Sequence, residues 1–169
     1  MTQQNPTVEQ RIARLEAIRQ IEELKYRYLR AVDGKNFDEF RECFVTEGGS
    51  FGYGPMGTFS SVDELLAVFN AYFLGRNDEG NYFIFDMHHA MHPTIELRSD
   101  TEAVGEWTLR FREVNTRDRV EMINAGSYRD VYVKVDGRWR VQQQEFSILW
   151  MISQPLPDGT DVLPLGFAS

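Results

Sequence analysis

The second half of the chain alternates between apolar and polar residues in four successive segments, and this pattern constrains the fold more than any other feature. The segments are residues 83–98, 102–115, 119–135 and 138–152. Turn-forming residues separate them at 99–101, 116–118 and 136–137. A period of two is typical of strands with one buried face, and short turns join antiparallel neighbours. The sequence therefore predicts an antiparallel meander of four long strands.

The first half of the chain has the pattern of helices. Thr7 and Gln10 have the spacing of a capping box, which satisfies the free backbone amides at the start of a helix. Apolar residues then recur at spacings of three and four from Ile12 to Val32, which predicts one apolar stripe over several turns. We expect Gly34 to end this helix in the left-handed conformation that glycine adopts readily.

Two further helices are predicted before the strands begin. Asn36 is a suitable N-cap for a second helix to about Val45, and Ser61 for a third. The glycine-rich stretch 48–57 between them predicts a short strand and loops. Helices followed by a meander indicate an α+β domain. We expect a cone-shaped, strongly curved antiparallel sheet, with three N-terminal helices against its concave face, that encloses a pocket.

Length and composition indicate one globular domain over residues 1–169, with a core at about 8–152. Residues 153–169 contain three prolines and two glycines and are expected to form an irregular tail. The apolar fraction is 42% and the aromatic fraction 13%, enough to build a core and line an apolar cavity. The formal net charge of −8 argues against nucleic acid, whose phosphates require a basic surface.

Other features predict a cytoplasmic protein that does not enter a membrane. The N-terminal residues are polar and lack the pattern of a signal peptide. No apolar run approaches the roughly 18 residues needed to span a membrane. The single cysteine, Cys43, excludes an internal disulfide and suits a reducing compartment.

Three stretches of the sequence carry a family likeness. They are residues 28–40, 87–96 and 126–139. Together they resemble the SnoaL-like group of the nuclear transport factor 2-like superfamily, which includes scytalone dehydratase, bile-acid 7α-dehydratase and hexachlorocyclohexane dehydrochlorinase. The resemblance covers about residues 10–152. It implies the cone-shaped fold, a homo-oligomer (a trimer in preference to a dimer), and catalysis without a metal or an organic cofactor.

The resemblance implies an acid–base pair formed by Asp33 and His88. Asp33 matches the catalytic aspartate of the three enzymes, and counting along the strand places their catalytic histidine on His88. A shift of one residue would move that role to His89, which faces the opposite side of a strand. His88 and His92 would share a face but lie about 13 Å apart, too far for one zinc ion. Tyr28 matches a catalytic tyrosine of the bile-acid enzyme, although core packing explains it almost equally well.

The predicted pocket wall is mostly aromatic, with a few polar groups. Its residues are Trp107, Phe111, Glu113, Asn124, Tyr128, Phe146 and Trp150. Glu113 stands where scytalone dehydratase has a second catalytic histidine, and its pattern also fits, slightly better, a solvated position at the rim of the sheet. Phe111 and Ile148 replace a catalytic aspartate and arginine of the bile-acid enzyme. These differences leave the substrate open.

The predicted function is that of a cofactor-independent lyase. A histidine held by a carboxylate can remove a proton while a leaving group departs from the neighbouring carbon. The expected substrate is a hydrophobic, aromatic or polycyclic small molecule. Two alternatives stay open: an isomerase or polyketide cyclase that uses the same base for enolisation, and a non-catalytic ligand-binding domain.

Overall fold

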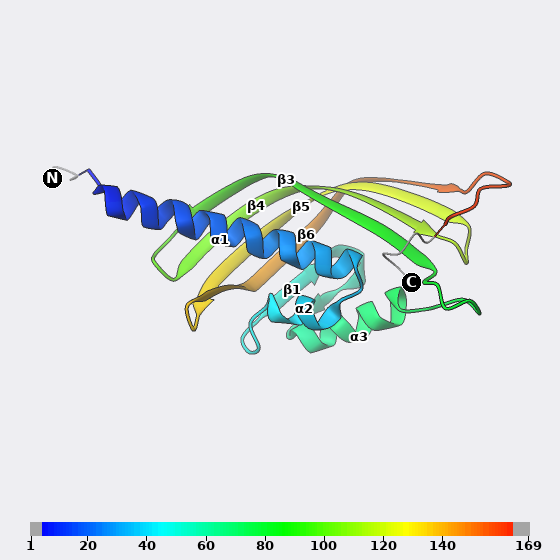
Figure 1. The fold of residues 1–169 in the computed structure, drawn as a ribbon, viewed down its shortest axis with the longest axis horizontal. Coiled ribbons are helices and arrows are strands. Elements are labelled where there is room, and N and C mark those ends of the chain that lie inside the picture. Colours follow the sequence, from blue (N-terminus) through cyan, green and yellow to red (C-terminus); the bar gives the residue numbers. More distant parts are fainter. Residues whose placement is uncertain (1–4, 164–169) are drawn as a thin grey trace.

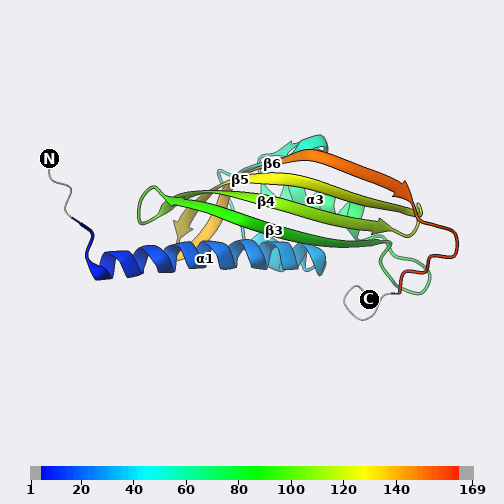
Figure 2. The ribbon, with the colours of Figure 1, turned by 90° about the horizontal axis from the view of Figure 1, so that it is seen from above.

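In a computed structural model, which describes residues 5–163, three helices pack on one face of a curved sheet of six strands (Figures 1 and 2). The helices are α1 (Val8–Asp33), α2 (Phe37–Glu42) and α3 (Val62–Phe73), with a short 3-10 helix η1 (Gly54–Met56). The strands are β1 (Ser50–Tyr53), β2 (Thr58–Phe59), β3 (Ile84–Leu97), β4 (Glu102–Asn115), β5 (Val120–Val135) and β6 (Arg138–Pro155). The predicted α+β class and curved sheet are confirmed.

The long strands form the predicted meander. The order across the sheet is β2-β1-β6-β5-β4-β3, in which β3 to β6 pair antiparallel in sequence order. β1 joins the outer edge of β6 in parallel, and β2 pairs with β1. The short strand predicted within 48–57 therefore extends the sheet. β6 continues to Pro155, so the tail expected from residue 153 begins later, and its residues 164–169 lie outside the described residues.

Helix α1 begins at the predicted capping box, in which the Thr7 side chain accepts a hydrogen bond from the amide of Gln10. Its end differs from the prediction. Gly34 has a φ of −80°, and the left-handed conformation falls on Lys35 with a φ of 57°. This displacement matters because it turns the Lys35 side chain into the interior, where it is 8% exposed.

The apolar stripe of α1 is buried only from Ile21 onward. Val8, Ile12 and Leu15 are exposed because the first turns of the helix extend beyond the sheet (Figures 1 and 2). From there α1 runs alongside β3, and its last turns close one side of the curved sheet. Within residues 5–163, no helix combines the length and apolarity that crossing a membrane requires.

The core lies between the helices and the concave face of the sheet. Aromatic side chains from α1, α2 and α3 pack around Phe40 and Phe69, in edge-to-face pairs such as Tyr28–Phe40 and in the tilted pair Phe40–Phe69. Such pairs add about 0.5–1.5 kcal/mol each beyond the area they bury. The helices thus hold one wall of a space whose other wall is the sheet.

Candidate active site

A cavity of about 360 Å³ lies between the helices and the concave face of the sheet. This volume is within the range of small-molecule sites, roughly 300–1,000 Å³. Its lining is mainly apolar and aromatic, with few polar groups. The lining residues are Tyr28, Val32, Tyr53, Pro55, Met56, Phe69, Tyr72, Phe73, His88, Leu109, Phe111, Glu113, Met122, Asn124, Tyr128, Phe146, Ile148 and Met151.

Asp33 and His88 meet at the wall of this cavity. The His88 Nδ1 and the Asp33 Oδ1 are 2.5 Å apart, and the backbone amide of His88 donates to both carboxylate oxygens at 3.1 and 3.2 Å. Asp33 closes the last turn of α1, and the His88 ring lies 4.5 Å from the ring of Phe111 (centroid to centroid). The geometry expected of the pair is therefore present.

The three histidines occupy different environments. His88 alone among them lines the cavity, because it faces the concave side of β3 together with Asp86. His89 is exposed and points the opposite way. His92 has a φ of 53°, and the pairing of β3 with β4 shifts between Met91 and Thr94. This bulge interrupts the alternation, so the predicted shared face of His88 and His92 does not persist.

A second buried ion pair lies beside the first. The Lys35 ammonium donates to the Asp86 carboxylate, and both side chains are almost completely buried. Burial raises the pKa of the Asp86 carboxyl, and Lys35 and His88 oppose that shift. Donor atoms of Asp33, Asp86 and His88 lie within 4.8 Å of one another, the spacing of a metal site. Lys35 already neutralises Asp86, and the Nδ1 of His88 already contacts Asp33. The cluster therefore fits an acid–base site better than a cation site.

Three hydroxyl groups and one carboxyl group add polarity to the cavity. The hydroxyls of Tyr28 and Tyr53 are 2.9 Å apart, and burial raises the pKa of both. Elsewhere in the lining, the hydroxyl of Tyr72 on α3 donates to the Oε1 of Glu113 on β4 at 2.7 Å. Burial raises the pKa of the Glu113 carboxyl, which is 5% exposed. Glu113 thus lines the cavity and does not form a solvated rim.

The structure places the predicted wall residues Phe111, Asn124, Tyr128 and Phe146 in the cavity lining. It also adds Tyr53 and Met151, which sequence reasoning missed. Tyr53 ends β1 within the glycine-rich stretch 48–57, where the sequence pattern did not predict which side chains face inward. Met151 is brought to the cavity by a bulge in β6.

Two of the predicted wall residues lie elsewhere, and those predictions were wrong. Trp150 is 54% exposed on the opposite face, because the register between β5 and β6 shifts between Ala125 and Gly126 and pairs Trp150 with Ala125. Trp107 faces the concave side but is packed below the cavity, where its Nε1 donates to the Tyr132 hydroxyl at 2.9 Å. Tyr26 packs against Trp107 and does not reach the cavity lining.

A buried charged network supports the cavity from below. The Lys25 ammonium donates to Asp130 at 3.0 Å and lies 3.5 Å from the ring centre of Tyr128, one of the lining residues. Asp130 also accepts a hydrogen bond from Tyr132 at 2.6 Å. Burial lowers the pKa of Lys25 to about 8, and Asp130 opposes the shift. Sequence reasoning missed this network.

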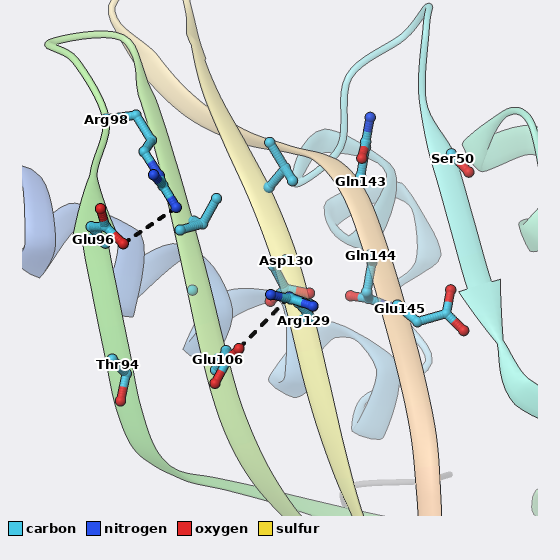
Figure 3. A pocket seen from close by; sticks show the side chains of 13 residues that line it. Ser50, Thr94, Glu96, Arg98, Glu106, Arg129, Asp130, Gln143, Gln144 and Glu145 are labelled. Carbon is cyan, nitrogen blue, oxygen red and sulfur yellow. Dashed lines mark ion pairs between the residues drawn. The ribbon is translucent and has the colours of Figure 1, made fainter.

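A second hollow, of about 470 Å³, lies on the outer face of the sheet (Figure 3). Its exposed walls carry ion pairs between Glu96 and Arg98 and between Glu106 and Arg129. The helices lie behind the strands in this view, so the hollow is separated from His88 by the sheet. Exposed ion pairs of this kind contribute little to stability. The Asp33–His88 pair therefore lies on the other side of the sheet from this hollow.

Solved structures share this architecture. A candidate scytalone dehydratase from Novosphingobium aromaticivorans DSM 12444 is 24% identical, with a TM-score of 0.71 over 89% of this chain and 98% of its own. A type 3 hexachlorocyclohexane dehydrochlorinase from Novosphingobium barchaimii LL02 is 17% identical, with a TM-score of 0.72 over 90% and 98%. A Mycobacterium tuberculosis protein of unknown function is 18% identical, with a TM-score of 0.65 over 80% and 73%. At these identities the likeness shows the fold alone.

A comparison with family models is more specific. The model described as a SnoaL-like domain matches residues 13–144, which include most of α1, the Asp33–His88 pair and most of the cavity wall. On this match and the shared fold, the chain belongs to the SnoaL-like domain family.

Proposed function

We propose that this protein is a cofactor-independent lyase that eliminates a leaving group from an uncharged ring compound, with His88 as the base. The observation that carries the proposal is the contact of His88 with the buried Asp33 at the wall of an apolar cavity. A histidine held by a carboxylate in this way is an arrangement suited to proton transfer.

The contact supports a separate role for each ring nitrogen of His88. The Nδ1–H donates to the Asp33 carboxylate, which leaves the Nε2 as the free base. Nε2 removes a proton from a substrate carbon, and the electron pair of that C–H bond becomes the new double bond as the leaving group departs with its own pair. The Asp33 carboxylate then stabilises the imidazolium, which returns its proton to the leaving group or to water.

The other polar groups suit the charge that develops on the substrate. When the proton lies next to a carbonyl, negative charge builds on the carbonyl oxygen. The paired hydroxyls of Tyr28 and Tyr53 can donate to that oxygen, in an apolar environment that strengthens hydrogen bonds. Glu113 is available on the same sheet wall as His88, and a raised pKa favours a protonated carboxyl that can donate to a leaving oxygen.

The same groups would also support an isomerase or cyclase. Proton removal by His88 and stabilisation by the tyrosine pair produce an enolate, and return of the proton at another carbon completes an isomerisation without loss of a group. The Tyr28–Tyr53 pair is the observation that favours this second candidate. Product analysis distinguishes the two reactions.

The test uses scytalone and hexachlorocyclohexane, the compounds that the names of two structural relatives suggest, together with a panel of uncharged aromatic, steroid and polyketide alcohols. Products are identified by mass spectrometry with a chelator present and no cofactor added. Loss of water or of hydrogen chloride would support the lyase, and a product of unchanged mass would support the isomerase.

Matched histidine variants make the test specific. We expect His88→Ala to lower turnover by about 10²–10⁴-fold, the usual contribution of a positioned base. His89→Ala should leave turnover unchanged, because that exposed side chain faces away from the cavity. Full activity in His88→Ala, or activity that the chelator abolishes, would contradict the proposal.

A further inference from the structure

Asn124 is a buried amide without a partner in the cavity wall. Its side chain is only 4% exposed, and its Oδ1 has no hydrogen-bond partner among the residues that the structure describes. Buried polar side chains in folded proteins almost always have a partner, because desolvation without one is costly. Since Asn124 also lines the cavity, a molecule bound there can supply the missing partner.

The register of the sheet fixes the place of Asn124 relative to the base. His88 on β3 and Asn124 on β5 both pair with Phe111 on β4, so the three residues form one row across the sheet. Two strand spacings separate the Cα atoms of His88 and Asn124 by roughly 10 Å. A ring compound lying over Phe111 would therefore present one edge to His88 and the opposite edge to Asn124.

The charges around the cavity restrict the group that can meet this amide. No lysine or arginine belongs to the described lining, so no such side chain there can neutralise a carboxylate or a phosphate. His88, the basic side chain of that lining, is already paired with the Asp33 carboxylate. A hydroxyl group remains neutral and can donate to a carbonyl-type oxygen such as Oδ1.

We propose that Asn124 is the specificity residue of this cavity, and that it binds a hydroxyl group at the end of a ring substrate remote from the carbon that loses its proton. The substrate class is thus an uncharged ring compound with a hydroxyl group opposite the reacting edge. The relation to a reacting edge rests on the proposed function, whereas the recognition of the hydroxyl does not.

Binding of three related probes tests the recognition without any turnover. Equilibrium dialysis with 2-naphthol, naphthalene and 2-naphthoate measures the affinity for a hydroxyl group, for the bare ring and for an anion. We expect the wild-type protein to bind 2-naphthol about 10-fold more tightly than naphthalene, the ratio that one net hydrogen bond of about 1.4 kcal/mol gives. 2-Naphthoate should bind at least as weakly as naphthalene.

Substitution of the amide should remove the preference. Asn124→Leu, which has nearly the same size, should reduce the ratio of the two affinities to about one by weakening 2-naphthol binding. Asn124→Ala serves as a second variant if the leucine is not accommodated. Gln143→Leu is the matched control, because this exposed amide lies on the outer face of the sheet and should leave the ratio unchanged (Figure 3).

The possible outcomes separate this proposal from the proposed function. His88→Gln should keep the preference for 2-naphthol even though it lacks the base, so the hydroxyl site can be supported if the lyase is refuted. An unchanged ratio in Asn124→Leu would overturn the proposal and indicate that Asn124 binds only a structural water. Absence of binding of both uncharged probes, or preferential binding of 2-naphthoate, would overturn it as well.

Discussion

The buried pair of Lys25 and Asp130 makes the strongest prediction about stability. Lys25→Met removes the ammonium, and the Asp130 carboxylate then keeps only the hydrogen bond from Tyr132. Both members of the pair are completely buried. Removal of one partner from such a pair costs about 3–5 kcal/mol, because it leaves an uncompensated charge. For a chain of this size the melting temperature should fall by roughly 6–20 °C.

The reverse substitution should cost less. Asp130→Asn leaves Lys25 beside the ring of Tyr128, and its pKa is already lowered to about 8, so the lysine can lose its proton instead of remaining charged. We expect about 1–3 kcal/mol for this variant, the cost of an unsatisfied buried polar group. The double variant Lys25→Met/Asp130→Asn has no buried charge, and should recover most of the stability lost in Lys25→Met.

Urea unfolding of the four proteins, followed by tryptophan fluorescence, measures these free energies and their coupling. Trp107 is a suitable reporter because it donates to Tyr132 within the same network. A loss of less than about 1 kcal/mol in Lys25→Met would refute the reasoning. A double variant no more stable than Lys25→Met would refute it too, since the loss would then come from packing and not from the unpaired carboxylate.

Three further predictions concern stability and assembly. Above about pH 10.5, Lys25 has lost its proton in the folded and the unfolded protein and no longer contributes a pH dependence. In this range the unfolding free energy should fall by about 1.4 kcal/mol per pH unit for each buried phenol that stays protonated. The reason is that the unfolded chain releases the phenol protons while the folded protein keeps them. Urea titrations at two alkaline pH values check this for Tyr28, Tyr53 and Tyr132, whose pKa values are raised. Gly126→Ala places a Cβ 2.4 Å from the Phe146 ring and 2.8 Å from a backbone oxygen. The substitution should lower the free energy of unfolding by about 1–3 kcal/mol and disturb the cavity wall. Thermal unfolding measures the first effect and probe binding the second. Light scattering at micromolar concentration should show a trimer or dimer, and a stable monomer would contradict this.

Local patterns were sufficient to predict most of the fold. The alternation of apolar and polar residues, together with the three turn signals, predicted the four long strands nearly residue by residue. Both signals depend on neighbouring residues alone. The bulges were not predictable, since an extra residue such as Leu149 leaves the composition of a strand unchanged while reversing the faces beyond it. This is why Trp150 was assigned to the wrong face of the sheet.

The candidate site depended on more than local pattern. Asp33 and His88 were identified through the family resemblance, and 55 residues separate them in the chain. Lys25 was missed because a lysine within a helix is usually solvated. A signal for its partner was present: Asp130 lies between Tyr128 and Tyr132 on the inner face of β5, and a carboxylate on an apolar face requires a buried partner.

The central claim, that Asp33 acts through His88 as one catalytic unit, is tested most directly by the turnover of His88→Ala, Asp33→Asn and their combination on the same substrate. If the two residues form one unit, each single variant loses about 10²–10⁴-fold and the double variant loses no more than His88→Ala, because effects within a unit are not additive. Losses that multiply in the double variant would contradict the account, since the two residues would then act independently.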